Sequence, residues 1–150
     1  MKRTFITTLL SLFVALVAMS CHSNEKETEI GFESLPQEAQ VFVKVYFPNA
    51  KYSHVVKEKD HGTIEYEVWL NDGTELEFDD SGNWKSVDCR FSSLPVGIIP
   101  YNIAVDINKR YPDAKPYKIE KKHGGYEIDI PGYDLYYNSK GEFVREEIDR

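Results

Sequence analysis

A short segment of this chain occurs twice: Phe32-Glu-Ser-Leu-Pro36 returns as Phe91-Ser-Ser-Leu-Pro95, 59 residues later. Further matches follow in the same order. Tyr46-Phe-Pro-Asn-Ala-Lys51 matches Arg110-Tyr-Pro-Asp-Ala-Lys115, and Lys59-Asp-His-Gly62 matches Lys121-Lys-His-Gly124. Self-similarity at a fixed spacing is the mark of tandem structural units. We therefore predict two repeats, residues 32–90 and 91–150.

Within each repeat the apolar residues change from helical to strand periodicity. Leu35, Ala39, Phe42 and Tyr46 fall on one helical face before Pro48, and Ile99, Ile103, Ile107 and Tyr111 do so before Pro112. Residues 64–70 then alternate apolar and polar side chains, as a half-buried strand does. The expected strands are residues 52–59, 64–70, 76–78, 84–91, 115–121, 126–130, 134–138 and 142–148. The predicted fold is α+β: two tandem repeats, each a helix followed by a four-stranded antiparallel meander, forming one helix-backed sheet domain.

The N-terminus has the features of an export signal. Lys2 and Arg3 precede an apolar run, and small residues at Ala18 and Ser20 come just before Cys21. Ala18-Met-Ser-Cys21 resembles the lipobox of bacterial lipoproteins, which implies a lipid on Cys21; the alternative is an ordinary signal followed by an incidental cysteine. We predict a signal peptide at 1–20, a flexible tether at 21–31 and a folded domain at 32–150.

Charge narrows the classes of partner. Residues 21–150 carry 16 Lys and Arg against 25 Asp and Glu, a net charge of −9. An acidic surface repels phosphate groups, which argues against nucleic acid and against anionic headgroups as the primary partner. With Cys21 acylated, Cys89 has no disulfide partner, and its strand pattern predicts a small buried side chain.

The strand motifs resemble the PepSY family. The relevant segments are Tyr66-Glu-Val-Trp-Leu70 with Leu76-Glu-Phe-Asp-Asp-Ser-Gly-Asn-Trp84, and Tyr126-Glu-Ile-Asp-Ile130 with Leu135-Tyr-Tyr-Asn-Ser-Lys-Gly-Glu-Phe143. Gly82 and Gly141 are the most diagnostic positions. A tandem PepSY-like form is similar in architecture to the β-lactamase-inhibitor protein. The resemblance implies a noncatalytic protein of the Gram-negative envelope, periplasmic or in the outer membrane, often linked to protease inhibition or envelope regulation.

No residue pattern indicates catalysis, a metal or a cofactor. The four histidines lack the spacing of metal ligands, and Asp79-Asp-Ser-Gly-Asn83 reads as a turn because the EF-hand spacing is missing. No nucleophile elbow or phosphate-binding glycine loop is present. We predict that the protein is not an enzyme.

Acidic and aromatic side chains alternate with the predicted core residues and should share the open face of the sheet. The predicted partner-binding residues are Glu65, Glu67, Trp69, Glu77, Trp84, Asp129, Tyr136 and Phe143. Such a face suits the binding of a protein or peptide partner. In one version of this hypothesis the partner is a hydrolase that the protein inhibits. Alternatively the aromatics are cross-strand pairs that stabilise the sheet. A different functional hypothesis is a carrier of a small apolar or cationic ligand, held between sheet and helices by Phe42, Tyr46 and Tyr66.

Overall fold

The computed structural model describes residues 26–149, so the predicted signal peptide and Cys21 lie outside the described residues. The elements are β1 (Lys26–Glu29), the 3₁₀ helix η1 (Phe32–Ser34), α1 (Gln37–Tyr46), β2 (Tyr52–Asp60), β3 (Thr63–Leu70), β4 (Glu75–Asp79), β5 (Trp84–Asp88), α2 (Tyr101–Arg110), β6 (Lys118–Lys122), β7 (Gly125–Ile130), β8 (Tyr133–Asn138) and β9 (Phe143–Ile148). The mixed α+β class is confirmed.

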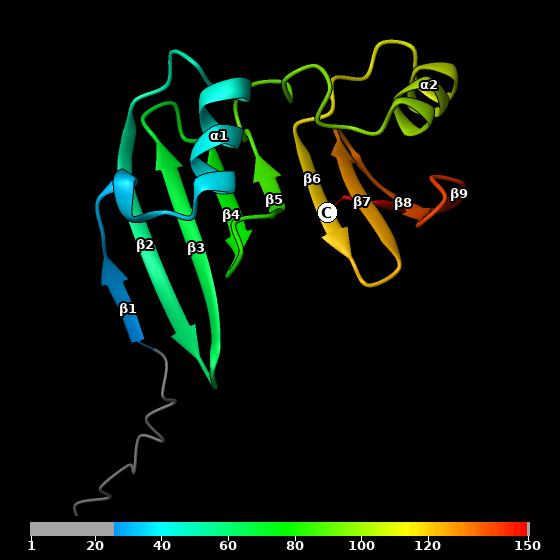
Figure 1. Cartoon of the computed structure of the whole chain (residues 1–150). Helices are drawn as coiled ribbons and strands as arrows, with labels where there is room; N and C mark the ends of the chain where they lie inside the picture. Colours follow the sequence, from blue (N-terminus) through cyan, green and yellow to red (C-terminus); the bar gives the residue numbers. More distant parts are fainter. Residues whose placement is uncertain (1–25, 150) are drawn as a thin grey trace, which may run out of the picture.

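All nine strands form a single antiparallel sheet in sequence order, from β1 to β9 (Figure 1). The two halves of the chain meet at β5 and β6, where Val87 pairs with Ile119. The backbone N–H of Cys89 donates to the carbonyl of Tyr117 at 2.8 Å and continues this junction. The Cys89 side chain is 1% exposed, so the prediction that it is a buried residue is confirmed.

β1 corrects the predicted flexible tether at 21–31. Residues 26–29 pair with β2, with Lys26 opposite Lys59 and Glu29 opposite Val56. All four β1 side chains are exposed, so the strand has no apolar alternation that the sequence could reveal. Its backbone hydrogen bonds to β2 hold it at the edge of the sheet.

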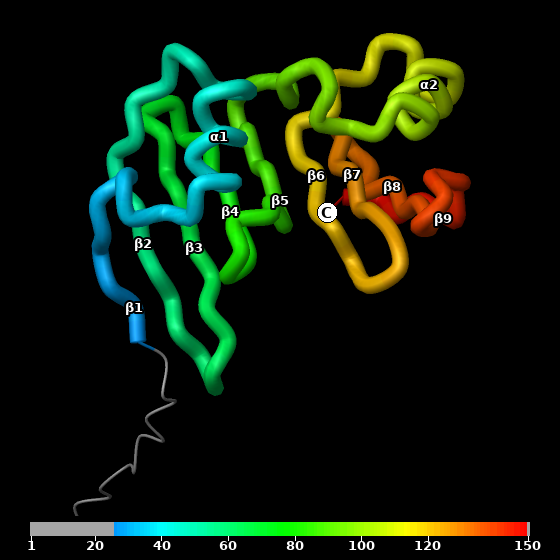
Figure 2. The backbone as a smooth tube through the Cα atoms, viewed as in Figure 1, coloured from blue at the N-terminus to red at the C-terminus, as the bar shows by residue number. Residues whose placement is uncertain are grey.

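Both helices cover the same face of the sheet and build one core. α1 buries Ala39 and Val43, and α2 buries Ile103 and Ile107. The strand side chains that pack in the same cluster are Val55, Tyr66, Val68, Leu70, Leu76, Phe78, Val87, Ile119, Ile128, Ile130, Leu135 and Tyr137. Figure 2 shows α1 over the first half of the sheet and α2 beside the second. The other face carries no helix of the described chain.

The β4–β5 turn touches the start of α1 at Gly82. This glycine has φ +87°, and a Cβ there would lie 2.7 Å from the Pro36 Cβ and 2.9 Å from the Ala39 backbone nitrogen. Only glycine avoids both the left-handed strain and the clash with the first helical turn. The turn and helix are therefore held together by a close backbone approach.

Gly82→Ala should lower the free energy of unfolding by about 2–4 kcal/mol, because left-handed strain and overpacking add. Gly62→Ala is the matched control, since Gly62 has φ +90° but nothing within 4 Å of its Cβ position. It should lose only the backbone term, about 1–2 kcal/mol. Urea denaturation measures both variants, and equal losses would contradict the contact between turn and helix.

Candidate functional site

The face of the sheet opposite the helices is rich in carboxylates. Directly paired residues share a face, so the strand register defines three rows across this surface, which we call the acidic face. The first row is Glu29, Val56, Glu67, Glu77, Ser86, Glu120, Glu127, Tyr136 and Arg145; the second is His54, Trp69, Glu75, Asp88, Lys118, Asp129, Asp134 and Glu147; the third is Glu27, Glu58, Glu65 and Asp79. The three rows hold fourteen acidic side chains and two basic ones, Lys118 and Arg145.

Lysines and arginines pair with at least seven of the fourteen carboxylates: Glu65, Glu75, Asp88, Glu120, Glu127, Asp129 and Glu147. Lys85 contacts Glu65 at 2.5 Å, and Lys122 contacts Glu120 at 2.7 Å and Glu127 at 3.3 Å. Arg90 reaches Glu75 at 2.8 Å. Glu67 and Glu77, which face each other across β3 and β4, form no ion pair within the described residues. The centre of the first half therefore has an excess of negative charge.

Burial, and secondarily this negative charge, reduces the acidity of individual carboxyls. Burial, followed by the charges of Glu77 and Glu58, raises the pKa of Glu67 to about 7. Burial also raises the pKa of Glu77, against the opposing effect of Lys85. In the second half, burial raises the pKa of Asp129 to about 6, and Lys118 opposes it. Ionisation of Glu67, Glu77 and Asp129 is therefore less favourable than in water, and a cation from a partner would stabilise their charged form.

Glu67 should make stability depend on pH. Its folded pKa is raised above 4.5, so the unfolded state loses this proton first and stability falls as pH rises from about 4.5 to about 7. Glu67→Gln removes that loss and should raise the free energy of unfolding at pH 8 by about 1 kcal/mol after solvent screening. At pH 4 the gain should vanish.

Urea denaturation at both pH values checks this expectation. Glu33→Gln is the control, because Glu33 is exposed in η1, away from the acidic face. A stabilisation by Glu67→Gln that is equal at pH 4 and pH 8 would contradict the proposed titration.

Two aromatic side chains lie among the acids as predicted. The Trp69 ring packs 5.3 Å from the His54 ring, which forms a hydrogen bond with the Glu29 carboxylate at 3.2 Å. The Tyr136 ring lies 3.6 Å from the Arg145 guanidinium, and its hydroxyl donates to Glu147 at 3.3 Å. Both rings are half-buried. Glu65, Glu67, Glu77 and Asp129 share the face with them.

The predicted placement of Trp84 and Phe143 on this face is wrong. The register shifts between Glu77 and Phe78 because Lys85 is an extra residue in β5, so Trp84 pairs with Phe78, a fully buried core residue. Trp84 consequently lies on the helix side, with its ring 6.1 Å from Phe42 of α1. The extra residue in a bulge reverses the alternation that the sequence suggested.

Phe143 is displaced in the same way in the second half. The register shifts between Tyr136 and Tyr137, so Phe143 pairs with Tyr137, which is 3% exposed. The Arg110 guanidinium of α2 stacks 3.8 Å from the Phe143 ring. Phe143 thus belongs to the packing under α2.

The sequence prediction omitted much of the acidic face. Glu120, Asp88 and Lys118 lie at the junction of β5 and β6, where Ser86 pairs with Glu120 and Asp88 with Lys118. Their alternation with Val87 and Ile119 was a usable signal. What the sequence lacked was the register between two strands separated by a whole helix.

The aromatic residues of the carrier hypothesis pack against other side chains. The Phe42 ring lies 4.7 Å from Tyr46 and 5.7 Å from Phe78. Phe42 and Tyr46 line a pocket of about 480 Å³ on the outer side of α1, to which Tyr66 does not contribute. The three residues therefore do not enclose one common cavity.

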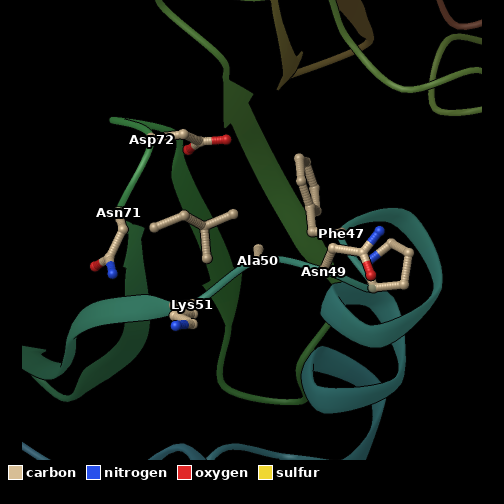
Figure 3. Close-up of a pocket in the computed structure, with 8 residues that line it drawn as sticks. Phe47, Asn49, Ala50, Lys51, Asn71 and Asp72 are labelled. Carbon is tan, nitrogen blue, oxygen red and sulfur yellow. The ribbon is translucent and has the colours of Figure 1, made fainter.

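Equivalent surface pockets lie at the ends of the two helices. The first, of about 540 Å³, is lined by residues 47–51 after α1 and by residues 70–72 at the β3–β4 turn (Figure 3). The second, of about 400 Å³, is lined by residues 110–114 and by Ile130, Pro131 and Tyr133. Asp72 in the first accepts a hydrogen bond from the Thr74 backbone at 2.9 Å, the usual role of a turn aspartate.

The described residues, 26–149, hold neither a metal-binding cluster nor a membrane-spanning helix. In that range no group of three or more His, Cys, Asp or Glu side chains is arranged to hold a metal ion. None of the helices there combines the length and apolar character needed to cross a membrane.

Comparisons with known proteins identify the family of this chain and solved structures of similar fold. A family model described as "Putative beta-lactamase-inhibitor-like, PepSY-like" matches residues 64–145. The crystal structure of "a putative periplasmic protein from DUF2874 family" of Bacteroides vulgatus is 32% identical, with TM-score 0.79, over 81% of this chain and 97% of that one. The search of curated proteins found no match.

Two more solved structures are similar over nearly their whole length. "A putative calcium-regulated periplasmic protein" of Bacteroides thetaiotaomicron is 35% identical, with TM-score 0.78, over 81% of this chain and 96% of that one. Another "putative periplasmic protein of unknown function" of Bacteroides vulgatus is 31% identical, with TM-score 0.76, over 82% and 98%. The chain described here belongs to the PepSY-like, β-lactamase-inhibitor-like family.

Proposed function

We propose that this protein is a noncatalytic envelope lipoprotein that binds a basic segment of another envelope protein on its acidic face. The observation that carries this proposal is the excess of acidic side chains on this face: the three paired rows hold fourteen acids against Lys118 and Arg145, and Lys85, Arg90 and Lys122 reach in from beside the rows. Complementary charge gives a binding surface its specificity and speeds association.

The partial burial of side chains on the acidic face supports a role in binding a partner over a role as an ordinary solvent-exposed surface. Glu67, Glu77 and Trp69 are half-buried although no helix of the described chain covers them. Half-buried aromatics among carboxylates give a partner both apolar contact and ion pairs. The family description supports inhibition of a hydrolase as the consequence of binding, and the relatives named as periplasmic support export.

The two halves of the domain are, in this proposal, copies of one duplicated unit. The order helix and then four strands occurs at α1 with β2–β5 and again at α2 with β6–β9. The last strand of each half has a bulge at the corresponding place, at Lys85 just after Trp84 and at Val144 just after Phe143. The duplication would place two related sets of carboxylates side by side on one surface.

Capture from envelope extract tests the proposal. Trp69→Ala combined with Tyr136→Ala should weaken binding of the partner about 30-fold and reduce its recovery, because aromatic contacts at interfaces are each worth about 1 kcal/mol or more. Phe91→Ala with Tyr101→Ala is the control, since these side chains are 86% and 85% exposed and belong to the β5–α2 loop and to α2. Equal recovery by both double variants would contradict the choice of surface.

A further inference from the structure

Three lysines lie together on the side of the sheet opposite the acidic face. Lys26 of β1 pairs with Lys59 of β2, which pairs with Ile64 of β3. Lys57 pairs with the core residue Tyr66, and its ammonium lies 5.9 Å from that ring. The register therefore places all three lysines on the helix side of strands β1 and β2. We call Lys26, Lys57 and Lys59 the basic patch.

The basic patch has no matching acid in the described residues. None of its lysines forms an ion pair there, and Lys26 and Lys59 face each other directly. Like charges opposite one another destabilise a pair of strands. A lysine on an edge strand discourages association with another sheet, which accounts for Lys26. It does not account for Lys57 and Lys59, because β2 is an interior strand.

The position of the patch along the chain suggests what it contacts. Four residues separate Cys21 from Lys26. Five residue steps span at most about 18 Å even when fully extended. A lipid on Cys21 would consequently hold Lys26 close to the membrane, within little more than two Debye lengths of about 8 Å.

We propose that the basic patch contacts anionic headgroups of the membrane that holds Cys21. The same membrane repels the fourteen carboxylates on the other side of the sheet. Attraction of the basic patch and repulsion of the acidic face therefore favour the same orientation of the domain. The acidic face then points away from the lipid and toward other proteins. This inference rests on acylation of Cys21 and not on the identity of the protein partner.

Amine labelling of the acylated mature protein in vesicles tests the orientation. Vesicles containing phosphatidylglycerol are compared with vesicles of phosphatidylcholine alone, and each labelled lysine is quantified by peptide mass spectrometry. In the anionic vesicles, Lys26, Lys57 and Lys59 should react at least about threefold more slowly, and about 0.5 M salt should remove the difference. Lys85 and Lys118 on the acidic side serve as internal controls and should react equally in both vesicles.

Three results would overturn the proposal. The first is equal labelling of the basic patch in the two kinds of vesicle. The second is stronger protection of Lys85 and Lys118 than of the patch. The third is a mature protein whose intact mass shows no acyl chain on Cys21. Loss of partner capture by acidic-face variants would leave all three readouts unchanged, so the two proposals fail separately.

Discussion

Replacing Glu67, Glu77 and Glu127 by Gln is expected to weaken binding of the captured partner about 100-fold. The three carboxylates lie in one row across the acidic face, and Glu67 and Glu77 have no ion pair of their own in the described structure. Losing about 1 kcal/mol at each position corresponds to this change in Kd. Titration of the purified partner against both proteins measures it.

The control for this variant keeps the same net charge. Glu33→Gln, Glu38→Gln and Asp113→Asn also remove three negative charges, but from exposed positions outside the strands. This control should bind within about threefold of the wild type, because distant exposed charges are screened. Equal weakening of both triple variants would mean that only overall charge matters, against a specific acidic face.

Phe78→Ala is expected to lower the free energy of unfolding by about 3–5 kcal/mol, as large-to-small changes of buried aromatics do. The Phe78 side chain is 0% exposed, and its ring meets Phe42 of α1 edge to face at 5.7 Å. Removing the ring leaves a cavity where the sheet meets the helix. Urea denaturation followed by circular dichroism measures the loss.

Phe91→Ala makes the same chemical change at a position that is 86% exposed. Its stability should stay within about 0.5 kcal/mol of the wild type. A similar loss for Phe91→Ala and Phe78→Ala would contradict the described core.

The main elements could be predicted because each core residue follows the period of its element. Ile103 and Ile107 mark α2, and Tyr66 and Val68 mark β3; all four are buried. β1 could not be predicted, because its four exposed side chains leave only backbone pairing to define it. The joining of the halves at Val87 and Ile119 depends on long-range register, which local periodicity does not contain.

The candidate site shows the same limit. Alternation correctly placed Trp69 and Tyr136 on the acidic face. Trp69 pairs with Glu75, and Tyr136 pairs with Glu127, and neither pairing between strands is shifted by a bulge. Alternation failed for Trp84 and Phe143, because a bulge residue separates each of them from Ser86 and Arg145, the residues of their strands that lie on the acidic face. A bulge adds one residue and exchanges the two faces, and no turn residue announces it in either segment.

Photocrosslinking in living cells tests the central claim most directly. A photoreactive phenylalanine analogue is placed at Glu120 or Tyr136 on the acidic face, or at Tyr101 or Val105 on the outer side of α2, which are 85% and 50% exposed. We predict one discrete crosslinked envelope protein from the first two positions and none from the last two. Adducts only from Tyr101 and Val105, or the absence of any adduct from Glu120 and Tyr136, would contradict binding on the acidic face.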